Sequence, residues 1–142
     1  MTRPSPKLVE LARRIVEQEA GGSGDPAASA AAAERACGRL SDHLIDLLGS
    51  GGVTALLGRG LNLAQREQPP LARVAISAEP GTCFNGLADA LLPCTDEEAM
   101  AAASTLLTHI FELLVMLLGE ELGMKPIRKL WPRATSAAEV QE

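Results

Sequence analysis

The chain has 142 residues, of which 46% are hydrophobic, and its formal net charge is −5. This length suits one domain whose core is large enough to fold without disulfide bonds or metal ions. The acidic balance and an aromatic content of 2% argue against nucleic-acid binding, because such proteins present basic patches and stack bases on aromatic rings.

Two helix-start signals lie in the N-terminal part of the chain. In Ser5-Pro6 and in Asp25-Pro26, a capping side chain precedes a proline at the first helical position. The first signal predicts an amphipathic helix that ends at the glycine-rich joint of residues 21–24. The second predicts a helix with an alanine-rich first half that continues to about Leu48.

A second glycine cluster, Gly49 to Gly52, separates this helix from a third one over residues 53–66. Gly58 and Gly60 inside the third helix each weaken it by about 1 kcal/mol relative to alanine. Gly60 lies among the apolar positions, so a close approach of another helix would offset that cost.

Residues 71–81 are the only strand-like part of the sequence, since Val74 and Ile76 alternate with small or polar residues. No second strand is evident, so we expect an extended, buried connector. The alternative is that two copies of the chain pair these residues across a dimer axis. A short helix over residues 83–92 should follow and end at Pro93.

The longest predicted helix covers about residues 95–122. Thr95 and Glu98 form a capping box at its start, and Gly123 suits its end. From Leu106 to Leu118 it is apolar on almost every side, as expected of a buried central helix. The residues expected to be mostly buried are Leu106, Leu107, Ile110, Phe111, Leu114, Leu117 and Leu118.

Together these elements predict an all-α fold, a compact bundle of five to six helices around that central helix. A last short helix over residues 126–131 offers Ile127, Leu130 and Trp131 to the core. It completes a single domain, residues 1–132, and residues 133–142 should form a mobile polar tail. Because an apolar helix needs many partners, we expect part of it, or the alanine-rich segment, to close against a second copy in a homodimer.

We do not expect the central helix to cross a membrane. A span needs roughly 20 apolar residues, and here Glu112, His109 and three hydroxyl side chains fall inside the stretch. The N-terminus leads into a charged helix and does not resemble a secretory signal. Three cysteines (Cys37, Cys83 and Cys94) match no zinc-site spacing, so we expect a cytoplasmic protein with free, structural thiols and no cofactor.

Each histidine precedes a carboxylate by three residues, which places His43 with Asp46, and His109 with Glu112, on one helix face. If the two faces met, these four residues would form a metal site like those between the helices of bundles. The alternatives are a solvated first pair and a buried, hydrogen-bonded second pair. With Met116 one turn further on, His109 and Glu112 are also the candidate residues for binding a small apolar ligand.

Lys125, Arg128 and Lys129 follow the acidic pair Glu120-Glu121 and lie close to Trp131. We expect the basic residues to pair with the two glutamates at a corner between helices. The functional alternative is a patch, completed by Trp131, that binds an anion or an acidic partner.

No pattern in the sequence identifies a catalytic residue, so an enzyme is the less favoured class. The sequence favours a regulatory or adaptor protein that acts through helix surfaces as a homodimer. A helical sensor domain that binds a small apolar ligand or a metal near His109 and Glu112 is the alternative.

Overall fold

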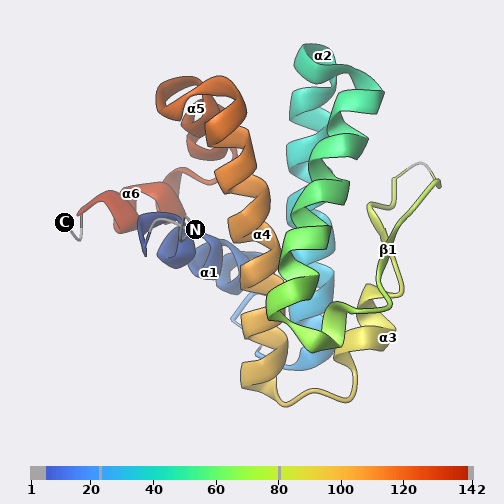
Figure 1. The fold of residues 1–142 in the computed structure, drawn as a ribbon. Helices are drawn as coiled ribbons and strands as arrows, with labels where there is room; N and C mark the ends of the chain where they lie inside the picture. The colour runs from blue at the N-terminus through green and yellow to red at the C-terminus, as the bar shows by residue number, and fades with distance from the viewer. Residues whose placement is uncertain (1–5, 23, 80, 141–142) are drawn as a thin grey trace.

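The structure, a computed structural model, describes residues 6–22, 24–79 and 81–140. The elements in chain order are α1 (Pro6–Glu19), α2 (Pro26–Glu67), η1 (Pro69–Leu71), β1 (Ala75–Ile76), β2 (Phe84–Asn85), α3 (Leu87–Leu91), α4 (Asp96–Leu118), α5 (Glu120–Leu130) and α6 (Pro132–Val140). Six α-helices in the described residues pack against one another, which confirms the all-α prediction (Figure 1). The predicted cap at Ser5 lies outside the described residues.

Helix α2 is a hairpin of two antiparallel arms, residues 26–48 and 50–67 (Figure 1). The turn between them is Gly49, whose φ of 74° and ψ of 166° are non-helical. A positive φ is readily adopted only by glycine, so the glycine cluster ends the first arm as predicted. At the start of α2 the Asp25 carboxylate accepts a hydrogen bond from the Ala28 amide at 2.7 Å, which confirms that cap.

The capping box at the start of α4 is confirmed, since Thr95 and Glu98 exchange both hydrogen bonds. The helix ends at Leu118 and not near residue 122, because Gly119 turns the chain with a φ of 88°. Glu120 and Glu121 therefore lie in the first turn of α5, where negative charge stabilises a helix. Helix α5 starts earlier than predicted and contains Pro126 within it.

Helix α4 lies at the centre of the bundle, between α1 on one side and the arms of α2 on the other (Figure 1). Five of the seven residues that we expected to be buried are fully so: Leu106, Leu107, Ile110, Phe111 and Leu114. Leu118 is only partly buried, and Leu117 is exposed. These two residues lie in the last turn of α4, beyond the part that α1 covers.

The second arm of α2 crosses α4 at Gly60. A β-carbon placed on Gly60 would lie 2.5 Å from Cγ1 of Ile110 and 3.4 Å from its backbone. The absent side chain therefore lets the two helices approach closely, which is the packing that the sequence suggested. Gly58, two residues earlier and on a different face of the helix, faces only Ile76 at 3.7 Å.

The strand-like segment pairs within the chain, contrary to the prediction of an unpaired connector. β1 and β2 form an antiparallel two-stranded sheet in which Ile76 lies opposite Phe84. Residues 84–85, which we placed in the short helix, are strand, so α3 begins only at Leu87. The carboxylate of Glu34 accepts hydrogen bonds from the amides of Cys83 and Phe84, and this attaches the sheet to α2.

The segment that we expected to be a mobile tail is largely helical. Helix α6 packs against α1 and α5, and its residues Ala134 and Thr135 are buried. Among the described residues, helical packing therefore continues beyond residue 132 up to residue 140. Residues 141–142 lie outside the described part of the chain.

Two described helices, α2 and α4, are long and apolar enough to cross a membrane by length and composition alone. In α2 that length comes from two arms that fold back on each other at Gly49. In α4 half of the most apolar stretch is buried inside the bundle, as in the core helix of a folded domain.

Replacing Gly60 by alanine should test the close crossing of α2 and α4. We expect Gly60→Ala to lower the free energy of unfolding by about 1–3 kcal/mol, because the new methyl group overlaps Ile110 and its backbone. Urea denaturation followed by circular dichroism measures the change. The control Gly58→Ala has room for its methyl group and should raise stability by about 0.5–1 kcal/mol. Equal effects of the two substitutions would contradict the crossing.

Candidate functional site

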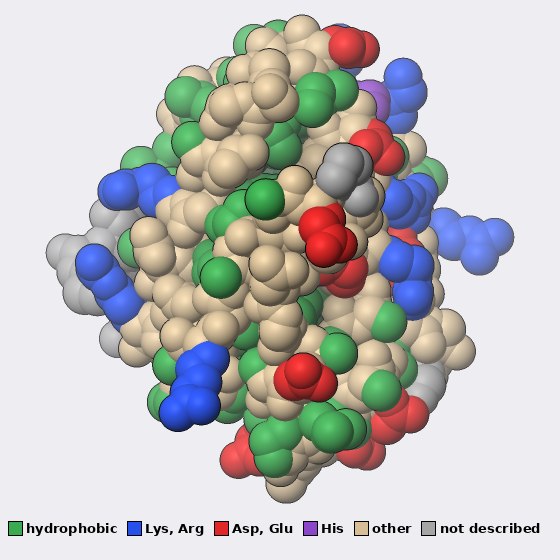
Figure 2. Space-filling model, turned by 90° about the vertical axis from the view of Figure 1, so that its right-hand side faces the viewer, with side chains coloured by type: hydrophobic (Ala, Val, Ile, Leu, Met, Phe, Trp, Pro, Cys, Tyr) green, Lys and Arg blue, Asp and Glu red, His purple; other side chains and the backbone are tan. Residues whose placement is uncertain are grey.

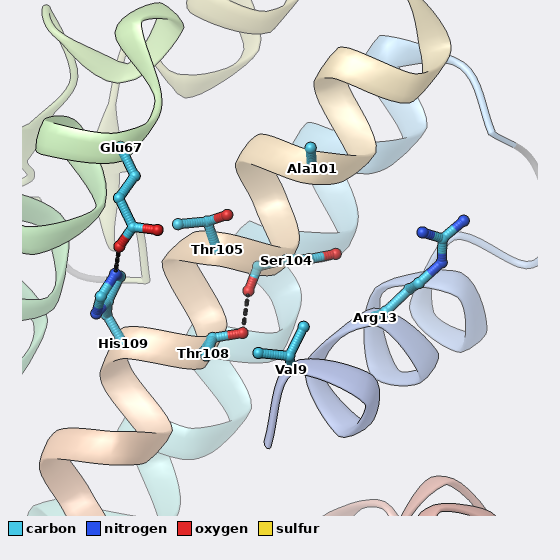
Figure 3. A pocket seen from close by; sticks show the side chains of 8 residues that line it. All are labelled: Val9, Arg13, Glu67, Ala101, Ser104, Thr105, Thr108 and His109. Carbon is cyan, nitrogen blue, oxygen red and sulfur yellow. Dashed lines mark hydrogen bonds and ion pairs between the residues drawn. The ribbon is translucent and has the colours of Figure 1, made fainter. Parts of the chain in front are cut away.

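A pocket of about 330 Å³ lies where α4 is flanked by α1 and by the end of α2 (Figure 3). Its floor is the face of α4 that carries small and hydroxyl side chains. One wall is the end of α2 and the other is α1. The residues that line it are Val9, Arg13, Glu67, Ala101, Ser104, Thr105, Thr108 and His109.

The centre of the pocket's polar chemistry is a pair formed by His109 and Glu67. His109 is buried, and its Nε2 hydrogen-bonds Oε2 of Glu67, the last residue of α2 (Figure 3). A carboxylate only accepts hydrogen bonds, so Nε2 carries the proton. The carboxylate itself is more than half exposed and reaches solvent beside the pocket.

The hydroxyl groups on the floor keep part of their hydrogen-bonding capacity. Thr108 donates to the carbonyl of Ser104 at 2.7 Å, and Thr105 accepts a hydrogen bond from Gln68 Nε2 at 3.1 Å. A hydroxyl has one donor and two acceptor sites, so Thr108 retains acceptor capacity and Thr105 retains its proton. The pocket therefore combines a mainly apolar lining with a few polar groups that are free to bind a ligand.

The three candidate ligand residues do not share one cavity. His109 lines this pocket and pairs with Glu67, not with Glu112. Glu112 is partly buried, and its Oε2 has no hydrogen-bond partner among the described residues. Met116 is 73% exposed and belongs to a separate apolar groove.

The predicted metal site does not form in the described part of the chain. There, no three His, Cys, Asp or Glu side chains gather in an arrangement that could hold a metal ion. His43 and Asp46 lie exposed on the first arm of α2, whereas His109 is buried against the second arm.

The apolar groove that contains Met116 has a volume of about 440 Å³ and lies between the second arm of α2 and the end of α4. Small residues of α2 face large apolar residues of α4 across it. Its lining residues are Gly52, Ala55, Leu56, Arg59, Leu113, Met116 and Leu117.

Trp131 is fully buried, as its place in the last helix suggested, so it does not complete the alternative surface patch with Lys125, Arg128 and Lys129. Its indole Nε1 donates to the carboxylate of Glu19 at 2.8 Å, and its ring packs against Phe111 with centroids 6.1 Å apart. The three basic side chains are exposed on α5. Within the described residues, neither Lys125 nor Lys129 forms the ion pair that we expected with Glu120 or Glu121.

Glu19 instead joins the end of α1 to the first arm of α2 and to the corner between α5 and α6, an arrangement that the sequence did not reveal. Besides Trp131, its carboxylate pairs with Arg39 and, at 3.6 Å, with Arg35, both from α2. Arg39 also donates to the carbonyl of Leu130 at 3.1 Å and lies 5.3 Å from the centre of the Trp131 ring. We call this group of residues the Glu19 junction.

The three cysteines are free thiols, two of them buried. Burial, followed by the neighbouring Glu34, raises the pKa of Cys83 to about 11. Burial also raises the pKa of Cys37, and burial with Glu98 raises that of Cys94. These directions agree with structural rather than nucleophilic thiols.

The pocket residues that the sequence did not predict are Arg13, Glu67 and the hydroxyls of α4. The hydroxyls share a helix face, which their spacing indicates, but Glu67 lies 42 positions before His109 and no local pattern connects them. Comparison of the chain with models of known protein families, with curated proteins and with solved structures finds no match.

Removing the Glu19 carboxylate should loosen the junction. We expect Glu19→Ala to lower the free energy of unfolding by about 1–3 kcal/mol, because it leaves a buried indole N–H without its acceptor and separates two arginines from their partner. The matched control is Glu17→Ala, an exposed member of an i,i+4 pair, which should change stability by less than about 0.5 kcal/mol. Similar losses in both variants would show that the junction is not stabilising.

The thiols should differ in reactivity toward an alkylating reagent in the folded protein. Cys94 is the most accessible and should be modified first, whereas Cys37 and Cys83 should react much more slowly in the folded protein. Because only the thiolate reacts, the rate at Cys83 should rise by about tenfold per pH unit up to its pKa of about 11. Mass spectrometry of digested samples measures each site, and rapid native modification of Cys83 near neutral pH would contradict this order.

Proposed function

We propose that this protein is a cytoplasmic regulatory or adaptor module that acts through protein–protein contacts, and that it functions as a homodimer. The observation that carries this proposal is the apolar groove between α2 and α4 together with the exposed side chains around it. Leu117 is 62% exposed and Met116 is 73% exposed, although both are large apolar residues on the central helix. Contiguous exposed apolar surface of this kind is typical of interaction sites.

Most of the large exposed apolar residues, Val9 and Leu92 excepted, lie near one end of the molecule, where the chain turns at Gly49 and at Gly119 (Figure 1). Leu47 and Leu122, which flank these turns, are exposed as well. Figure 2, which views the molecule from the side of the α2 hairpin, shows apolar side chains scattered over this face among uncharged surface. We call the region around the two turns the apolar end.

A second copy of the chain fits the apolar end because the surface offers both halves of a contact. Gly52 and Ala55 leave space on α2, and Met116 and Leu117 project beside that space from α4. A two-fold dimer brings the same patch of both copies together, so the large residues of one copy meet the small ones of the other.

The charges at this end support the same arrangement. Arg59 lines the groove and has no ion-pair partner among the described residues, while Glu120 and Glu121 are exposed at the adjacent start of α5. In a two-fold dimer Arg59 of one copy lies within reach of these glutamates of the other. Such charges contribute more to the register of an interface than to its affinity.

Sedimentation equilibrium should detect a dimer of the 14.9 kDa chain at about 50 μM, a concentration typical for micromolar association. We expect Leu117→Glu to convert it to a folded monomer, because the new carboxylates would be buried at the interface. The control is Leu92→Glu, at an equally exposed leucine after α3 at the opposite end, which should leave the dimer intact. A wild-type monomer at this concentration would overturn the homodimer.

A further inference from the structure

We propose that the pocket between α1, α4 and the end of α2 binds a small zwitterion, a molecule of the amino-acid class with one ammonium and one carboxylate group. This site is separate from the apolar end and does not depend on dimer formation. The inference rests on the placement of opposite charges on the two walls of one pocket.

Glu67 and Arg13 stand on opposite walls, with the floor of α4 between them (Figure 3). Glu67 uses Oε2 for its bond to His109, and Oε1 has no partner among the described residues. This oxygen can accept a hydrogen bond from an ammonium group. His109 holds the carboxylate in position, because it is buried in the core and restricts the rotation of the glutamate.

Arg13 supplies the positive charge on the α1 wall. Its one ion pair among the described residues is a long one, 3.7 Å from Nε to Glu17, and both side chains are exposed. Exposed pairs of this kind contribute little energy, so the guanidinium can turn to a carboxylate at the pocket mouth without a large loss. Arginine also binds carboxylates with two parallel hydrogen bonds, which favours it for this role.

The floor supports a polar ligand that lies across it. Thr105 retains a proton to donate and Thr108 retains acceptor sites, and both residues lie between the two charged walls (Figure 3). Val9 and Ala101 provide the apolar contacts for a short carbon chain. A volume of about 330 Å³ is at the lower end of ligand pockets, which limits the ligand to a small molecule.

Three probes with the same four-carbon chain separate the contributions of the two walls. They are γ-aminobutyrate, which carries both charges, n-butylammonium and butyrate. We expect γ-aminobutyrate to shift the amide NMR signals of Thr105 and Thr108 with roughly tenfold higher affinity than either singly charged probe. β-Alanine and δ-aminovalerate, one carbon shorter and longer, then measure the separation of the two charges.

Two variants assign each charge to its wall. Glu67→Gln should reduce the affinity for γ-aminobutyrate to that for butyrate, and Arg13→Gln should reduce it to that for n-butylammonium. The matched controls Glu79→Gln and Lys129→Gln change exposed charges on the turn after β1 and on α5, away from the pocket, and should leave binding unchanged. Circular dichroism confirms that each variant is folded.

Three results would overturn the proposal. They are equal affinities for the three probes, no shift at Thr105 and Thr108 up to about 20 mM zwitterion, and unchanged binding in folded Glu67→Gln protein. Preference for n-butylammonium alone would assign a cation site to Glu67 and refute the role of Arg13. Sedimentation of the same samples measures whether the protein is a dimer. Failure of the ligand proposal can therefore be distinguished from failure of the homodimer proposal.

Discussion

The crossing at Gly60 and Ile110 joins α2 and α4, the two helices that pack most extensively in the described part of the chain. The second arm of α2 and α4 run antiparallel and come closest where Gly60 has no side chain. Straight helices that meet at one point separate on both sides of it. The apolar groove lies between these two helices on the side of Gly52, and the polar pocket lies on the side of Glu67, where α1 also flanks α4. The two surfaces of different chemistry therefore lie on opposite sides of one helix contact.

The Glu19 junction has a different effect, because it connects parts of the chain that are distant in sequence. Glu19 ends α1, Arg39 lies in the first arm of α2, and Trp131 stands between α5 and α6. Their hydrogen bonds close the C-terminal helices over α1, and Phe111 of α4 packs against the same indole ring. The wall of the polar pocket that α1 provides therefore depends on a group that lies outside the pocket.

Features that depend on neighbouring residues were predictable from the sequence. The capping box of Thr95 and Glu98 starts α4 as expected, Gly49 ends the first arm of α2, and the inner residues of α4 are buried. Each of these follows from side chains within one or two helical turns of each other. The end of α4 was misplaced because Gly119 and Gly123 both suit a helix end, and only packing decides between them.

Features that depend on distant residues were not predictable. Glu112 was the expected partner of His109 because it lies three residues further along the same helix. Folding brings the carboxylate of Glu67, from another helix, close to the imidazole, and His109 forms its hydrogen bond with Glu67 instead. The strand that pairs with Ile76 could not be recognised in the sequence, because it begins at Phe84 and is only two residues long. The burial of Trp131 was expected, but its hydrogen-bond partner was not, because Glu19, which accepts from the indole N–H, lies 112 positions earlier.

Trp131 is the only tryptophan in the chain, and there is no tyrosine. The intrinsic fluorescence of the protein therefore comes from a single position, inside the Glu19 junction. Its emission reports whether α1, α5 and α6 are closed together, whereas far-ultraviolet circular dichroism is dominated by the long helices α2 and α4. Unfolding observed by the two signals distinguishes opening of the junction from melting of the central bundle without any label.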